Sequence, residues 1–221
     1  MADKDPGQDS LFKEIDEELR HEQFAKLWKK YGNYAIAVAI LAVVGVAGYQ
    51  GWNSYDLDRR AGESAAFSEA LRAADRDNAP EAAAALTKLA ETGSTGYALL
   101  SKMDQAGLKA RAGDKKAAAS AYLAIANDKN TDEEMRSLAI LLSVLQELDE
   151  GDPKALSERV APLAAPANPW RHTAKEFTAL LAQRMGEPQR AGQLFRELAD
   201  DATAPSGVRA RAAEMTAIIG G

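Results

Sequence analysis

Between Lys30 and Asp56 lie 25 consecutive residues without a charged side chain, Tyr31–Tyr55. The most apolar part, Tyr34–Trp52, would span roughly 28 Å as a helix, which is close to the ~30 Å hydrocarbon thickness of a bilayer. Aromatic residues stand at both ends, as in the interfacial belts of membrane helices: Trp28, Tyr31 and Tyr34 before it, and Tyr49, Trp52 and Tyr55 after it. The sequence therefore predicts a transmembrane helix over residues 31–55.

Two other interpretations of this stretch are less favoured. A buried core helix of a soluble protein is seldom apolar on every face. A cleaved signal peptide would follow a short basic segment, whereas here 30 acid-rich residues precede the span, and the end of the stretch, Tyr49–Tyr55, does not resemble a small-residue cleavage site. We expect the helix to be a retained anchor.

The basic residues predict the orientation of this anchor. Arg20, Lys26, Lys29 and Lys30 precede the span, whereas Arg59 and Arg60, which follow it, are offset by Asp56 and Asp58. Positively charged residues next to a membrane helix stay on the cytoplasmic side. We therefore expect an inner-membrane protein in which residues 1–30 form a cytoplasmic tail. Residues 56–221 would then be periplasmic.

Small residues in the span, including Gly45, Gly48 and Gly51, would let a second membrane helix approach closely. The alternative is that the span merely shares the alanine-rich bias of the whole chain. In the tail, Ser10 is placed to cap a helix running to about Lys30. That helix could lie on the inner leaflet, dock on a protein or be a solvated extension of the membrane helix.

The composition indicates an all-α fold without nucleic-acid or thiol chemistry. Apolar residues make up 46% of the chain but aromatic residues only 6%, so closely packed, alanine-rich helices are more plausible than an aromatic core. The net charge is −6, so the chain lacks the basic surface that binding to the phosphate backbone of a nucleic acid requires. The chain has no cysteine, which excludes disulfides, thiolate nucleophiles and Cys-ligated metals.

A repeated spacing organises residues 56–221. Four turn residues, Asp77, Gly113, Gly151 and Gly186, are 36, 38 and 35 residues apart. Each is followed by residues at offsets of five, nine and twelve, namely Ala82, Leu86 and Leu89; Ala118, Tyr122 and Ile125; Leu156, Val160 and Leu163; and Ala191, Phe195 and Leu198. A turn, then a small residue, then bulkier residues on the same helix face, describes a helix that packs back on its predecessor.

This pattern resembles the tetratricopeptide repeat, a helix–turn–helix unit of 34 residues. It departs from that repeat in two ways, because the first helices lack the full Trp-Leu-Gly-Tyr pattern and Leu156 replaces a small residue. The resemblance implies a TPR-like array of about four helix pairs, 60–76 with 79–91, 95–112 with 114–127, 132–150 with 152–164, and 169–185 with 187–200. A closing helix is expected over Pro205–Ile219.

Two sets of array residues are candidates for specific roles. We expect five residues to pack where helices touch: Ala82, Ala118, Tyr122, Ala191 and Phe195. The first helices of successive pairs should line a groove, because the second helices tend to back the superhelix. Tyr97, Lys102 and Trp170 are the candidates for that groove.

No catalytic, cofactor or metal site is predicted. His21-Glu22 begins like the HExxH zinc motif, but the position of the second histidine is Ala25. His172 has no second His or Cys to share a metal and is expected at the surface or in the groove. Gly62–Ala66 approximates a nucleophile elbow without its closing glycine or a preceding strand.

The order of these features resembles the YfgM-type ancillary subunits of the Sec translocon. The resemblance is carried by the membrane exit Gly51–Tyr55, the first repeat helix Ala61–Leu71, the opening of the second pair at Thr95–Leu99, and the placement of Trp170 and Gly186. It covers about residues 25–220. This chain departs from the family pattern in its longer, acidic tail.

The resemblance implies a non-catalytic interaction module that associates with SecYEG and with PpiD, a membrane-anchored periplasmic chaperone. It would help to pass exported polypeptides to periplasmic folding factors. A TPR scaffold for envelope assembly or cell division would have the same topology, and the sequence does not separate the two. A membrane-anchored hydrolase is a third possibility, disfavoured by the lack of a catalytic set.

Overall fold

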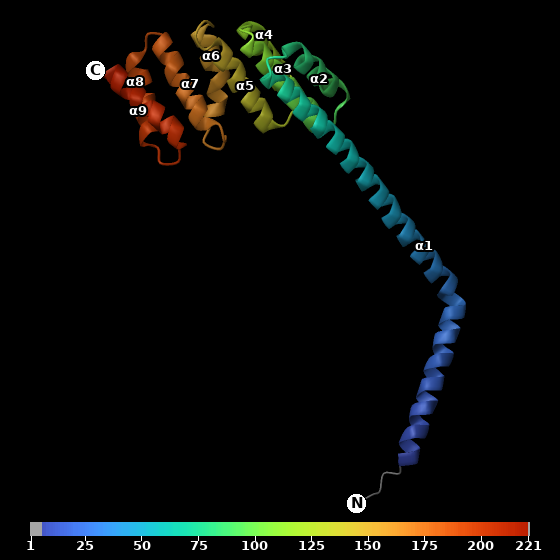
Figure 1. Cartoon of the computed structure of the whole chain (residues 1–221). Helices are drawn as coiled ribbons and strands as arrows, with labels where there is room; N and C mark the ends of the chain where they lie inside the picture. The colour runs from blue at the N-terminus through green and yellow to red at the C-terminus, as the bar shows by residue number, and fades with distance from the viewer. Residues whose placement is uncertain (1–5, 221) are drawn as a thin grey trace, which may run out of the picture. The chain divides into compact units, whose positions relative to one another are not determined.

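The computed structural model describes the backbone of residues 6–220 and the side chains of residues 25–34 and 36–219. Within these ranges the chain is helical without strands, which confirms the all-α prediction (Figure 1). The helices are α1 Pro6–Asp75, α2 Ala79–Thr92, α3 Thr95–Arg111, α4 Lys115–Asn127, α5 Glu133–Glu147, α6 Pro153–Val160, the 3₁₀ helix η1 Ala161–Ala164, α7 Arg171–Arg184, α8 Pro188–Asp200 and α9 Ser206–Gly220.

The first helix differs from the sequence prediction at its start. Ser10 was expected to cap a helix ending near Lys30, but α1 begins at Pro6 and continues without a break to Asp75. No proline interrupts the segment after Pro6, so nothing in the backbone chemistry stops the helix before the turn at Asp77. The side chains of Ser10 and His21 lie outside the described ones.

Contacts divide the chain inside α1 into two compact units, one ending at Arg59 and the other beginning at Arg60. In the first unit, the part of α1 from Ala25 onward is long and apolar enough to cross a membrane. None of its apolar window is buried within the structure. This exposure contradicts the core-helix interpretation, because a core helix buries its apolar surface inside its own domain.

In the second unit, successive helices pack on one another as antiparallel neighbours, as the repeat pattern predicts (Figure 1). The last part of α1 enters this array at Glu63, whose carboxylate accepts hydrogen bonds from the backbone N–H (2.9 Å) and the hydroxyl (2.5 Å) of Ser94. Ser94 immediately precedes α3. The Glu63 carboxylate on α1 therefore satisfies one of the backbone donors that have no partner within the helix at the start of α3.

Three predicted turns reverse the chain through a left-handed residue. Asp77, Gly113 and Gly186 have φ values of 57°, 83° and 77°. After Gly113 and Gly186, the next N–H donates to a carbonyl five residues back, as in a Schellman motif. Gly151 serves a different purpose, because a Cβ there would lie 2.9 Å from the carbonyl oxygen of Glu147. At Gly151 the absence of a side chain permits close approach rather than a positive φ.

The third pair departs from the predicted ranges. Its second helix was expected to run over 152–164, but the α-helix ends at Val160 and continues as the 3₁₀ helix η1. Pro162 explains the change, because proline has no N–H to donate and its ring crowds the preceding helical turn. The first helix, expected to reach residue 150, ends at Glu147.

The core is formed where each helix of the repeat touches its neighbours. All twelve residues of the spacing pattern are buried, with exposed fractions of 6% or less. They belong to clusters built across consecutive helices, in which alanines such as Ala106, Ala139 and Ala179 lie beside Tyr122 or Phe195. Helix α9 packs on α8 through Val208 and Ala212, so it covers the end of the array as predicted.

Candidate protein-interaction surfaces

The five predicted repeat-packing residues lie at helix contacts. Ala82, Ala118 and Ala191 are fully buried, and Tyr122 and Phe195 are exposed by 6% and 1%. Burial, together with the nearby Asp104 carboxylate, raises the pKa of the Tyr122 hydroxyl above its ordinary value. These residues therefore position the helices of the array and are not available as contacts for a partner.

The three predicted groove residues lie in different surroundings. Tyr97, half-buried on α3, packs its ring against Phe67 of α1 with 5.8 Å between centroids. Trp170, at the entrance to α7, packs against the cluster around Leu141 and Val144. Its indole Nε1 is buried without a hydrogen-bond partner among the described residues. Tyr97 and Trp170 thus belong to separate parts of the array, and their contact with a client stays a prediction.

Lys102 is the exposed member of the three. Its ammonium lies 3.9 Å from a carboxylate oxygen of Asp128, and it lines a cavity of about 220 Å³ between α3 and α4. Ala121, Ala124 and Ile125 form the apolar part of that cavity. Lys102 and the apolar side chains beside it could therefore make a weak contact with a protein partner.

The membrane-helix candidates Gly45, Gly48 and Gly51 all lie on exposed parts of α1. A Cβ placed on any of them would meet open space as far as the described residues extend. Their surface is therefore accessible to another helix, and a helix contact at these glycines stays a prediction.

His172 was expected at the surface or in the groove, but it is buried. It is 7% exposed, with Nδ1 3.4 Å from a carboxylate oxygen of Asp201 and Nε2 3.4 Å from the hydroxyl of Thr203. That hydroxyl and the backbone N–H of Thr203 both donate to Asp201, and these hydrogen bonds hold the pKa of Asp201 below its ordinary value. Since the Thr203 hydroxyl is directed to Asp201, the group joins α7 to the loop before α9 rather than presenting a nucleophile.

A second link holds the closing helix on α7. Glu176 is 6% exposed, and its two oxygens accept hydrogen bonds from Nε (2.6 Å) and Nη2 (2.8 Å) of Arg211 on α9. The hydrogen bond to this carboxylate raises the pKa of Arg211 above its ordinary value. The fork geometry of a guanidinium matches a carboxylate, so the pair fixes the position of α9 on the last helix pair.

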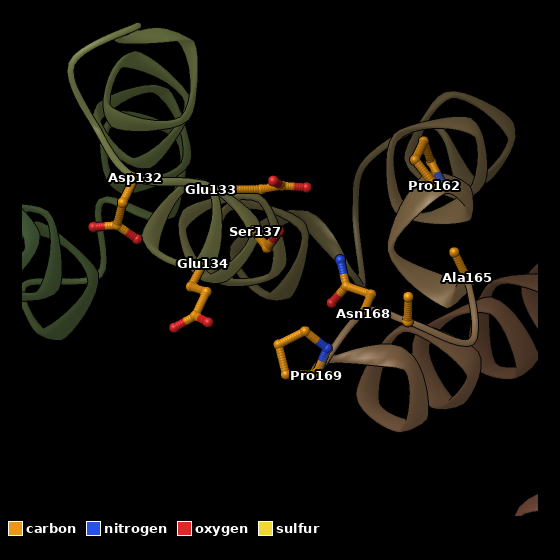
Figure 2. Close-up of a pocket in the computed structure, with 9 residues that line it drawn as sticks. Asp132, Glu133, Glu134, Ser137, Pro162, Ala165, Asn168 and Pro169 are labelled. Atoms are coloured by element: carbon orange, nitrogen blue, oxygen red, sulfur yellow. The ribbon is translucent and has the colours of Figure 1, made fainter.

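A larger cleft, about 600 Å³, opens between the start of α5 and the loop leading to α7 (Figure 2). We call it the α5 cleft. Asp132, Glu133, Glu134 and Ser137 form one side, and residues within 162–169 form the other. The sequence analysis missed it, although the acidic run at 132–134 and the Pro-rich break after η1 were both visible signals.

The side chains described do not form a metal centre, because they include no group of three His, Asp or Glu able to hold an ion. The approximate nucleophile elbow at Gly62–Ala66 lies inside α1, where Glu63 is hydrogen-bonded to Ser94. The described residues therefore form surfaces, clefts and hydrogen-bonded links between helices, but no metal centre or nucleophile elbow.

These observations define a helical-repeat protein whose outer surfaces and clefts are suited to contacts with other proteins. The chain belongs to the tetratricopeptide repeat-like domain family, whose model matches residues 25–187. The matched region begins before the apolar stretch, so the candidate membrane helix is part of the family domain. No curated protein and no solved structure matches the chain.

Proposed function

We propose that this protein is a non-catalytic interaction module at the Sec export site of the bacterial inner membrane. In this proposal residues 1–30 are cytoplasmic, residues 31–55 cross the membrane, and the array of residues 56–221 lies in the periplasm. The partners are SecYEG, a PpiD-like periplasmic chaperone and exported polypeptides, and the array assists their hand-off to folding factors. No small molecule or cofactor takes part.

The observation that carries the proposal is the continuity of α1. One helix contains both the exposed apolar stretch and the first helix of the repeat array. A domain anchored in this way stays near the membrane, where local concentration compensates for weak individual contacts. The TPR-like family supports protein partners in general, and the YfgM-type resemblance supports the export site in particular.

Topology is the first test. Protease added to spheroplasts should degrade the array and leave the cytoplasmic tail intact, because the Lys26, Lys29 and Lys30 cluster favours retention on the inner side. Protection of the array from protease would contradict both the orientation and the export role.

Partner identity is the second test. A photo-crosslinking residue placed at Val38 or Val43, which are 66% and 68% exposed on α1, should capture translocon subunits in native membranes. The control replaces residues 31–55 by an unrelated membrane helix that carries the crosslinking residue at the same position, and loss of capture would then show that the span itself recognises the translocon. Capture of envelope-assembly or division proteins instead would identify the scaffold alternative, and turnover of a substrate by the purified protein would contradict the non-catalytic role.

A further inference from the structure

The α5 cleft combines an acidic side with an apolar side. In Figure 2, Asp132, Glu133 and Glu134 extend from the start of α5, and Pro162, Ala165 and Pro169 belong to the opposite wall. At about 600 Å³, the cleft is large enough for a long side chain with part of its backbone. Its two walls thus offer different chemistry to one occupant.

Two carboxylates on the acidic side of the cleft have no ion-pair or hydrogen-bond partner among the described side chains. Asp132 already accepts the N–H of Met135 as the cap of α5, at 2.9 Å. Glu133 and Glu134 are exposed, and neither makes an ion pair or hydrogen bond with the side chains described. Since Asp132 is occupied by its capping role, the negative charge available to a ligand comes chiefly from the two glutamates.

An independent feature points into the same space. Ser137, one turn further along α5, is only 5% exposed and lines the cleft. Within the described part of the chain no side chain or backbone group is hydrogen-bonded to its hydroxyl. The hydroxyl oxygen is not among the fully enclosed atoms, so a ligand in the cleft can reach it and donate or accept a hydrogen bond there.

A cationic side chain on an extended polypeptide fits these features. The described residues offer no three-carboxylate group for a metal ion, and an anion would meet the two free glutamates. The methylene stem of lysine or arginine can lie along the proline and alanine wall while its charged end reaches the glutamates. We propose that the α5 cleft binds basic residues of polypeptide clients.

This proposal rests on the polypeptide-binding part of the proposed function and adds a selectivity to it. Clients with lysine or arginine in an unfolded segment bind at α5, whereas acidic segments are repelled by the same charges. Because the carboxylates are exposed, the contact is weak and salt-dependent. Weak binding suits a site that must release its client to another factor.

The experiment uses the full-length protein in neutral detergent micelles. The probe is a short labelled peptide of Gly, Ser and Leu with interspersed Arg, and its counterpart carries Glu at the same positions. The double variant Glu133→Gln/Glu134→Gln should bind the basic peptide about five- to tenfold more weakly than wild type. The matched control removes two exposed carboxylates elsewhere on the array, Glu91→Gln/Glu214→Gln, and should bind like wild type.

A second variant tests whether filling the cleft itself blocks the peptide, and the control double variant accounts for net charge. Ala167→Arg places a guanidinium at the exposed loop side of the cleft, where it should occupy the site and weaken peptide binding while adding one positive charge. Equal weakening by the control double variant, or wild-type binding by both cleft variants, would overturn the proposal. So would equal binding of the basic and acidic peptides by the wild-type protein.

Failure of the cleft proposal is separable from failure of the proposed function. Crosslinking to the translocon is measured in the same cleft variants and should be unchanged, because that contact is assigned to the membrane helix. A wild-type protein that prefers basic peptides but never crosslinks to the translocon would support the cleft and contradict the export role. A protein that crosslinks to the translocon normally but shows no preference for basic peptides would support the export role and contradict the cleft proposal.

Discussion

Removing the guanidinium of Arg211 should release the closing helix α9. In the native array Glu176 is 6% exposed and both its oxygens accept hydrogen bonds from Arg211, at 2.6 and 2.8 Å. The variant Arg211→Gln leaves this carboxylate without its charged partner in a place where water reaches it poorly. Hydrogen bonds to charged groups contribute about 1.5–3 kcal/mol, and breaking a fully buried pair costs about 3–5 kcal/mol.

The lower of these ranges applies here, because the Arg211 side chain is 59% exposed and solvent screens part of the interaction. A loss of about 2 kcal/mol corresponds to roughly a 30-fold rise in the open population of α9. The effect should be local, since a terminal element of a repeat array contacts chiefly its neighbour and can open alone.

Hydrogen exchange measured by mass spectrometry on the full-length protein in detergent reads this population directly. Amides of residues 206–219 should exchange about 30-fold faster in Arg211→Gln, while those of α3 and α4 stay unchanged. The matched control is Lys175→Gln, which removes the pair with Glu197, whose side chains are 35% and 45% exposed. That loss should be below about 1 kcal/mol. Unchanged protection of α9, or an equal effect of Lys175→Gln, would refute the reasoning.

Five further substitutions test the array itself. Ala118→Leu and Ala191→Leu each add volume at a fully buried contact and should cost about 1–3 kcal/mol, so an unchanged melting temperature in both would show that the repeat register is wrong. Ser101→Ala removes a fully buried hydroxyl with no partner among the described residues, so thermal denaturation should show a gain of about 1 kcal/mol, and a loss would reveal a partner for the hydroxyl. Asp77→Gly relieves a left-handed backbone at φ 57° and should stabilise by about 0.5 kcal/mol, whereas Gly113→Ala should destabilise by about 1 kcal/mol in the same urea titration.

The repeat architecture could be predicted because its signals are local. The turn residue and the residues five, nine and twelve positions after it lie close together in the sequence, and the twelve residues that follow the four turns are buried. The 3₁₀ segment was also foreseeable, since Pro162 stands where the predicted helix would need an N–H donor. The spacing of Leu156, Val160 and Leu163 alone predicts an α-helix through residue 164, which Pro162 prevents.

The links between distant residues could not be predicted in the same way. Glu176 lies in a polar-looking stretch of α7 and is buried because Arg211, 35 residues later, pairs with it. His172 is buried for a similar reason, because the loop containing Asp201 and Thr203 covers it. A single sequence shows that these side chains are polar but not which ones meet. The α5 cleft likewise depends on how the loop of residues 162–169 lies opposite the start of α5.

The exposure of α1 argues that this chain needs an apolar environment beyond its own array. Seven large aliphatic side chains between Ile36 and Val46 are 49–70% exposed, and none of the apolar window is buried. Burying such a side chain completely contributes about 1.5–3 kcal/mol, so leaving about half or more of each of the seven exposed to water forgoes on the order of 10 kcal/mol. That is as large as the whole stability of a typical domain. A bilayer about 30 Å thick would cover all faces of this segment at once, whereas a protein groove would cover one face. If the helix lies in lipid, as the proposed function requires, the same energy would keep the array beside the membrane.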